Sequence, residues 1–233
     1  MADLIVYVDG FNLYHGLHGK YRHRYLWLDL VALARSLRPR DELVKVKYFT
    51  ASVMNDPGAL SRQDTYLQAL SAHGGTKIEI VKGRYQSKPK RCRSCGATWT
   101  HYEEKETDVN IAVSLVSDIA TRAADSAMII SGDSDLSPAV RTAKSLMPSA
   151  HIIAAFPPGR SSHELRKIMP ASFTIFRAKF AGAQLPQTVK DPRTGHVLER
   201  PAKWAMAAEE VSVPHQATPA RTNASGHTCP TQR

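Results

Sequence analysis

The sequence of 233 residues has few cysteines, no long apolar run and no glycine-rich phosphate-binding motif. Its three cysteines, Cys92, Cys95 and Cys229, are too few for a disulfide framework. No stretch approaches the roughly 18 consecutive apolar residues of a membrane span, and Asp3 stands where a secretory signal would be basic. No predicted strand leads into GxGxxG or a P-loop, so no nucleotide cofactor is expected. These absences predict a cytoplasmic protein that does not enter a membrane.

The chain is strongly basic. It carries 31 Lys and Arg against 21 Asp and Glu, which gives a formal net charge of +10 and a pI near 9.6. Such a charge favours a polyanionic partner, because phosphate contacts release counterions and steer association. The acidic residues nevertheless gather after the predicted strands. This contrast suits an enzyme that holds a phosphate-bearing substrate with basic groups and handles one phosphate with a metal ion.

Short apolar runs alternate with segments of helical spacing along the chain. Strands are expected at residues 4–8, 43–50, 76–82, 127–130 and 151–156, with an edge strand at 173–176. Helices are expected at residues 28–37, 59–73, 108–122, 136–146 and 162–169. Right-handed crossovers between these strands predict a three-layer α/β fold, with a mostly parallel central sheet flanked by helices.

The predicted domain covers residues 1–180 and contains a polar, basic insertion at residues 83–106. From residue 181 to residue 233 the apolar periodicity is lost, and Pro, Thr, Gln and Ala become frequent. This composition predicts a largely disordered C-terminal tail. Residues 202–211, which include Trp204 and Met206, are the one segment expected to form a short docking helix.

Four aspartates occupy the positions where a parallel sheet would bring them together. Asp9, Asp133 and Asp135 follow two apolar strands, and Asp108 opens a helical segment. Each one alone is explained by an Asx turn or a helix cap. Together they would repel one another and raise their pKa values unless a cation lay between them. Hard oxygen ligands of this kind predict a Mg²⁺ or Mn²⁺ site.

Three motifs carry a family resemblance. VDGFNLY, KETDVNIA and ISGDSDLSPAV, in this order and spacing, resemble the NYN-domain family of PIN-like ribonucleases over about residues 4–176. The resemblance implies a PIN-like fold and metal-dependent cleavage of RNA. It also implies that Asp9, Asp108 and Asp133 are metal ligands and catalytic residues.

Other positions of the motifs have roles implied by the same resemblance. Asn12 matches the amide of the first motif, while Ser131 and Asp135 match positions that line the site. Asn12 can donate a hydrogen bond to a phosphate, and Lys105 is expected to balance developing charge, although a solvated lysine is the alternative. Ser114 departs from the pattern if it stands where the family carries a further acid. One metal ion is therefore expected more strongly than two.

The expected chemistry follows from charge. A divalent ion held by the aspartates would polarise a phosphoryl oxygen and lower the pKa of a bound water, so no histidine base is needed. The resemblance implies products with a 5′-phosphate and a 3′-hydroxyl.

The insertion contains Cys92-Arg-Ser-Cys95-Gly, the spacing of half a zinc site. His101 is a candidate third ligand, and His73, Cys229 or a partner subunit is a candidate fourth. The alternative is a pair of reduced surface thiols.

Basic and aromatic residues interleave in the same insertion, which is typical of binding to single-stranded or looped RNA. The candidate substrate-binding residues are Arg84, Arg91, Arg93 and Trp99. A solvated loop is the alternative. For the whole chain, the second interpretation is an RNA-binding or regulatory module whose nuclease site is weakened. The sequence leaves open the target RNA, cleavage of DNA, homo-oligomers and an inhibitory partner.

Overall fold

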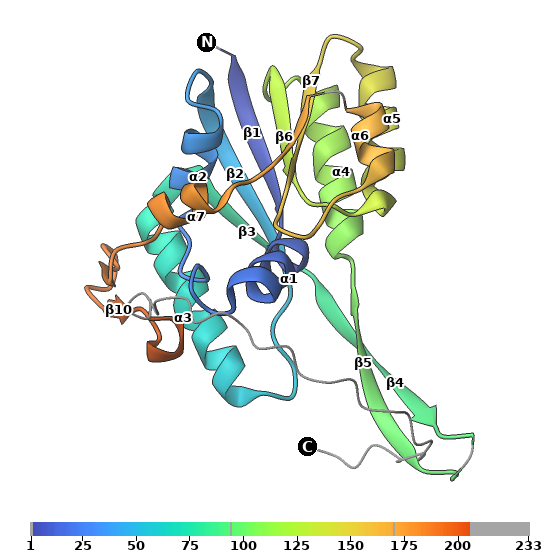
Figure 1. The fold of residues 1–233 in the computed structure, drawn as a ribbon, viewed down its shortest axis with the longest axis vertical. Coiled ribbons are helices and arrows are strands. Elements are labelled where there is room, and N and C mark those ends of the chain that lie inside the picture. The colour runs from blue at the N-terminus through green and yellow to red at the C-terminus, as the bar shows by residue number, and fades with distance from the viewer. Residues whose placement is uncertain (1, 94, 170, 206–233) are drawn as a thin grey trace, which may run out of the picture.

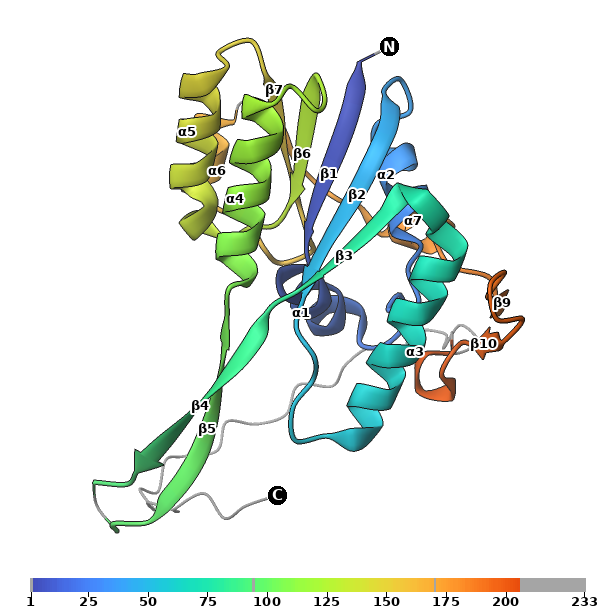
Figure 2. The same cartoon turned by 180° about the vertical axis from the view of Figure 1, so that it is seen from behind.

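The computed structural model describes residues 2–93, 95–169 and 171–205, and a six-stranded parallel sheet lies at its centre (Figures 1 and 2). From one edge to the other the strands are β3 (Ile78–Lys82), β2 (Glu42–Thr50), β1 (Asp3–Asp9), β6 (Ser126–Ile130), β7 (His151–Phe156) and β8 (Ser172–Thr174). Each neighbouring pair in this sheet is parallel. The predicted α/β fold with a parallel central sheet is confirmed.

Helices cover both faces of the sheet (Figure 1). The first face carries α1 (Gly10–Tyr21), α2 (Leu30–Leu37), α3 (Pro57–Gly74) and α7 (Arg177–Gly182). The second face carries α4 (Thr107–Ala120), α5 (Ser137–Leu146) and α6 (His163–Ile168). Three short 3₁₀ helices, η1 (Gly75–Lys77), η2 (Ser134–Leu136) and η3 (Ala202–Trp204), complete the described helices.

The strand β1 shows why its sequence is apolar throughout. Leu4, Val6 and Val8 pack into the core on the first face of the sheet. Ile5 and Tyr7 pack into the core on the second face. A strand that is buried on both faces reads as a continuous apolar run rather than as an alternation.

The chain reverses its direction of sheet growth between β1 and β6. From β1 it crosses to β2 and then β3 on one side, whereas β6, β7 and β8 extend the sheet on the other side. The two central strands are in register at their carboxyl ends, where Val8 lies opposite Ile130. Open parallel sheets bind ligands in the crevice at such a switch point. Asp9 is the last residue of β1, and Asp133 follows the end of β6.

The basic insertion folds as an antiparallel hairpin of β4 (Arg84–Arg91) and β5 (Thr98–Lys105). Figures 1 and 2 show the hairpin projecting away from the sheet. The strand β5 leads directly into α4, so the hairpin is attached at the helix that carries Asp108. The hairpin therefore begins and ends beside the predicted site.

The C-terminal segment is part of the fold as far as residue 205, so the disordered tail predicted from residue 181 is wrong for residues 181–205. The segment forms η3 and a hairpin of β9 (Thr188–Lys190) and β10 (Val197–Glu199). Val189, Leu198 and Trp204 are buried in the core on the first face. Each short strand buries only its middle residue, so no periodicity is visible in the sequence.

Other expectations concern residues that the structure does not describe. The rest of the predicted tail, residues 206–233, lies outside the described residues, and so does most of the docking helix expected at 202–211. Within the described parts of the chain, no helix is long and apolar enough to cross a membrane.

Candidate metal centre

Asp9 is placed by a sharp change from strand to helix. It is the last residue of β1 and the N-cap of α1, where its Oδ1 accepts the Asn12 backbone N–H at 2.9 Å. The next residue must be glycine, because a Cβ on Gly10 would lie 2.5 Å from the carbonyl oxygen of Phe49. The Asp-Gly pair thus ends the strand, begins the helix and points the carboxylate toward the carboxyl edge of the sheet.

Asp133 is held in the segment that follows β6. The buried Ser131 hydroxyl donates to Asp9 Oδ2 at 2.8 Å and accepts the Asp133 backbone N–H at 3.0 Å. The Asp133 carboxylate in turn accepts the backbone N–H of Asp135 at 2.9 Å. Ser131 therefore links two of the aspartates and fixes their relative positions.

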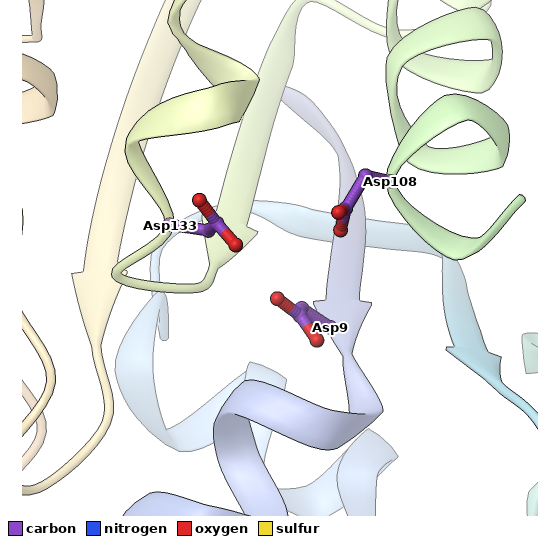
Figure 3. A group of neighbouring side chains, drawn as sticks. All are labelled: Asp9, Asp108 and Asp133. Atoms are coloured by element: carbon purple, nitrogen blue, oxygen red, sulfur yellow. The ribbon is translucent and has the colours of Figure 1, made fainter. Parts of the chain in front are cut away.

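Asp108 approaches Asp9 and Asp133 from α4, which lies on the second face of the sheet. It lies in the first turn of α4, after Glu106, whose left-handed backbone (φ 79°) turns the chain from β5 into the helix. One carboxylate oxygen from each of Asp9, Asp108 and Asp133 lies within 4.8 Å of the others (Figure 3). Asp135, which we predicted as a fourth ligand, is exposed and lies outside this group of three.

The three neighbouring carboxylates repel one another, and a bound cation would offset this repulsion. Asp9 is only 4% exposed. Burial raises its pKa, and the Asp133 carboxylate raises it further, while hydrogen bonds from Asn12, Ser131 and Phe11 lower it. A buried carboxylate beside two others favours a divalent cation, and three hard oxygen ligands suit Mg²⁺ or Mn²⁺. The residues present therefore fit the predicted metal.

A small cavity of about 190 Å³ opens at the three aspartates. Its other lining residues are Phe11, Asn12, His15, Thr107 and Arg160. Only Asn12 of these five was predicted, and the two titratable residues that were missed are His15 and Arg160. Burial lowers the pKa of His15, and the Arg160 guanidinium lowers it further, which favours a neutral imidazole.

Arg160 had a signal in the sequence, whereas His15 lies on α1, a helix that was not predicted. Arg160 follows the apolar strand β7, so the strand-end argument that located Asp133 also applies to it. His15 lies four residues after Phe11 on the first helix, so the two share a face.

The other predicted site residues fall into two groups. Asn12 lies at the cavity, where its side-chain carbonyl accepts the Gly132 backbone N–H at 2.9 Å and so connects the first and last motifs. The hairpin residues are spread along β4 and β5. At the base, Arg84 pairs with Glu106, and Lys105 lies 3.2 Å from Glu103. Toward the tip, the remaining three are exposed: Arg91, Arg93 and Trp99.

The cysteines lie at the turn of the hairpin. Cys92 is half-buried and Cys95 is exposed. The turn closes through Cys92, whose N–H donates to the Ala97 carbonyl at 2.8 Å. The side chain of His101 and all of Cys229 lie outside what the structure describes, and His73 lies 3.2 Å from Asp29. Zinc binding therefore stays a prediction.

The comparison with family models decides the family. A model described as the NYN domain matches residues 3–175. This chain belongs to the NYN-domain family. NYN domains are PIN-like nucleases, so the three aspartates lie in a nuclease domain. The predicted family membership is confirmed.

Individual relatives of this NYN-domain protein are distant. It is 30% identical over 172 residues to the 6-hydroxy-3-succinoylpyridine 3-monooxygenase HspA of Pseudomonas putida, with 58% of this chain and 54% of that protein covered. The chain thus spans about half the length of the curated relative it matches. It also resembles the crystal structure of a protein of unknown function, VPA0982 of Vibrio parahaemolyticus. Their TM-score is 0.51 at 19% identity, covering 79% of this chain and 96% of that one. At this identity the structural likeness shows the fold alone.

Gly132 offers a test of how the segment after β7 is positioned. A Cβ at this residue would lie 2.8 Å from the Ser161 backbone nitrogen and 2.9 Å from the Arg160 carbonyl carbon. We expect Gly132→Ala to displace the segment that carries Arg160 and to destabilise the fold by about 1–3 kcal/mol, as overpacking does. Urea unfolding measures the loss. Gly19→Ala is the control, because nothing lies within 4 Å of its added methyl group. Equal stability of Gly132→Ala and the wild type would contradict the predicted packing.

Proposed function

We propose that this NYN-domain protein is a metal-dependent ribonuclease that hydrolyses phosphodiester bonds in single-stranded or looped RNA. The observation that carries the proposal is the group of three carboxylates within 4.8 Å at the switch point of an NYN domain. The experiment is an RNA cleavage assay of the purified chain with added Mn²⁺ or Mg²⁺ and a chelator control. Cleavage that needs the added ion supports the proposal.

The chain supplies a preorganised ligand set. Asp9, Asp108 and Asp133 would hold Mg²⁺ or Mn²⁺, which when bound supplies Lewis-acid charge and a more acidic water. Ser131 holds two of these carboxylates by hydrogen bonds, so little reorganisation is needed when an ion binds. Asp135 supports the set through its backbone N–H. Its own carboxylate is available for a second ion or for a water molecule.

Substrate phosphates would contact the donors around the cavity. The Asn12 carbonyl is engaged by Gly132, so its NH₂ group is the part of the amide suited to donate to a phosphate oxygen. Arg160 lines the same cavity and offers a planar guanidinium, which matches phosphate geometry. Lys105 lies at the end of β5, beside the start of α4. These cationic groups would offset the charge of the strand while the aspartates hold the ion.

The hairpin would hold the RNA strand beyond the cavity. Two-stranded hairpins are marginally stable alone, and this one projects from the domain (Figure 2). Lys88 and Lys105 together lower the pKa of Glu103 to about 2, so this acid stays ionised and paired. Exposed Arg91, Arg93 and Trp99 remain for phosphate contact and base stacking.

A double substitution at the hairpin tip tests this role. We expect Arg91→Ala with Arg93→Ala to weaken binding of single-stranded RNA. The plot of log K against log salt concentration has a negative slope, and its magnitude should decrease by about 1.4. Each lost contact with a single strand contributes about 0.7 to that magnitude. Fluorescence anisotropy over a salt series measures both quantities.

The matched control removes the same charge elsewhere. Arg35 lies on α2 and Arg40 lies three residues after its end, and both are exposed. The helix α2 lies away from the hairpin (Figure 1). Arg35→Ala with Arg40→Ala should leave the slope nearly unchanged. An equal decrease in slope for both pairs would show that net charge, and not the hairpin, determines RNA affinity.

A second candidate is an RNA-binding or regulatory module without cleavage activity. Ser114, half-buried on α4, is the observation that favours it, if Ser114 is the position at which the family carries a further acid. RNA binding without metal-dependent cleavage, unchanged by Asp133→Asn, would support this module.

The Pseudomonas putida relative raises a different candidate. Its name describes oxygenation of 6-hydroxy-3-succinoylpyridine, and a cavity of about 580 Å³ beside the aspartates of this chain has room for a substituted pyridine. Binding of such a compound by the purified chain would favour this candidate.

A further inference from the structure

A second and larger cavity adjoins the aspartates. Its volume is about 580 Å³, within the range of small-ligand sites. It lies among α1, α3, the end of β2 and the base of the β4–β5 hairpin. Phe11 and His15 line both this cavity and the cavity at the aspartates. A ligand that occupies both cavities would pass along the first turns of α1.

The larger cavity has several aromatic side chains in its walls. Seven aromatic side chains line it: Phe11, Tyr14, Tyr48, Tyr66, Tyr85, Tyr102 and Trp204. Tyr66 is held in place by its hydroxyl, which donates to the Leu28 carbonyl at 2.8 Å. Its ring meets those of Tyr48 and Trp204 edge to face, at centroid distances of 6.4 and 6.1 Å. Burial raises the pKa of Tyr48 to about 12, so this wall is uncharged at neutral pH.

The rim of the cavity is polar and held in place. Gln63 of α3 accepts the Val53 backbone N–H at 2.8 Å and donates to the Ala51 carbonyl at 2.9 Å. These bonds attach the loop after β2 to α3. Asn55 on this loop has a left-handed backbone (φ 63°), and Arg62 also lines the cavity. The lining thus offers the Asn55 amide, which can pair with the edge of a base, and the Arg62 cation for a phosphate, beside the Asp56 carboxylate.

We propose that this cavity binds one unpaired nucleobase of the RNA strand, with its ribose, while a neighbouring phosphate lies at the three aspartates. The inference rests on the proposed ribonuclease function and assigns it a base-binding site. A planar, uncharged ring fits the aromatic walls, and stacking on such walls tolerates any base. The shared Phe11 and His15 connect the base to the phosphate position. The base must leave its stack to enter, so paired RNA would be a poor substrate.

Tyr14 and Tyr102 are cavity-lining aromatic residues suited to substitution. Tyr14 on α1 is 40% exposed, and Tyr102 on β5 is half-buried, so neither is a core residue. The test is fluorescence anisotropy of the full chain carrying Asp9→Asn, which is expected to slow cleavage by more than roughly 100-fold. The two probes are labelled octauridylate and an abasic strand with the same number of phosphates. Tyr14→Phe keeps the ring, and Phe176→Ala removes an aromatic ring that is 75% exposed and outside the cavity.

If the cavity binds a base, the tyrosine-to-alanine variants should lose affinity only for the strand that carries bases. Tyr14→Ala and Tyr102→Ala should each weaken octauridylate binding by roughly 5- to 100-fold and leave the abasic strand unaffected. Tyr14→Phe and Phe176→Ala should bind both strands like the parent. An equal loss for the two strands, or no loss for either, would overturn the inference. A further probe is free 2-hydroxypyridine, which carries the pyridine ring that appears in the name of the Pseudomonas putida relative. If it binds in the cavity and octauridylate does not displace it, the cavity is a small-molecule site and the inference is overturned.

The result separates this inference from the proposed function. If wild-type protein cleaves RNA but the tyrosine variants show no base-dependent loss, the base site alone is wrong. If the base-dependent loss is found but the wild type never cleaves RNA, the ribonuclease proposal is wrong and the cavity is the base-binding site of an RNA-binding module.

Discussion

Asp9→Asn is expected to reduce metal-dependent RNA cleavage by more than roughly 100-fold, because even residues that only support metal ligands cost 10- to 100-fold when changed. The substitution is nearly isosteric. The amide oxygen can still accept the Asn12 backbone N–H, while the charge that would bind the ion is lost. Initial rates on labelled single-stranded RNA at saturating Mn²⁺ measure the effect. Asp108→Asn and Asp133→Asn should give similar losses.

Folding stability gives a readout that is independent of activity. Mn²⁺ should raise the melting temperature of the wild type, because a ligand that binds only the native state stabilises it. The same addition should leave Asp9→Asn unchanged. Asp64→Asn, on α3 and outside both cavities, is the matched control and should behave like the wild type in both assays. Full activity of Asp9→Asn would remove this carboxylate from the site.

Phe180→Ala is expected to destabilise the protein by about 3–5 kcal/mol, the usual cost of removing a buried phenylalanine ring. Phe180 lies on α7, beyond the residues matched by the NYN-domain model, and is 0% exposed. The same segment is fixed by Trp27, whose indole N–H donates to the Pro186 carbonyl at 2.7 Å. Urea unfolding measures the loss. An m value equal to that of the wild type checks that unfolding is still two-state.

Phe176→Ala provides the comparison. Phe176 is the N-cap residue of the same helix but is 75% exposed, so its loss should change stability by about 0.5 kcal/mol or less. If both variants have the stability of the wild type, the C-terminal segment does not contribute to the core in solution.

The strands and the aspartates could be predicted because burial leaves a strong signal. The strand β1 is apolar at every position between residues 4 and 8 because both faces of the sheet are covered, and the residue that follows an apolar strand lies at the ligand-binding edge. Asp9 and Asp133 follow from this rule. The rule does not predict that Asp135 lies outside the group of three aspartates. The sequence cannot show which of the two carboxylates, Asp133 or Asp135, turns toward Asp9.

Other elements left weaker signals. The helix α1 was missed because Gly10, Gly16 and Gly19 suggest a break in the chain. Two of these glycines are instead close contacts, since a Cβ on Gly16 would lie 2.8 Å from the Pro158 carbonyl oxygen. The hairpin strands were missed because their residues are mostly exposed and polar. A sequence shows burial more clearly than it shows close packing or strands that project into solvent.

The most direct test of the account is the analysis of product ends after wild-type protein has cleaved single-stranded RNA in Mn²⁺. Hydrolysis supported by an ion at Asp9, Asp108 and Asp133 predicts fragments with a 5′-phosphate and a 3′-hydroxyl, and no fragments in the presence of chelator. Fragments ending in a 2′,3′-cyclic phosphate, or cleavage that continues in chelator, would contradict the central claim.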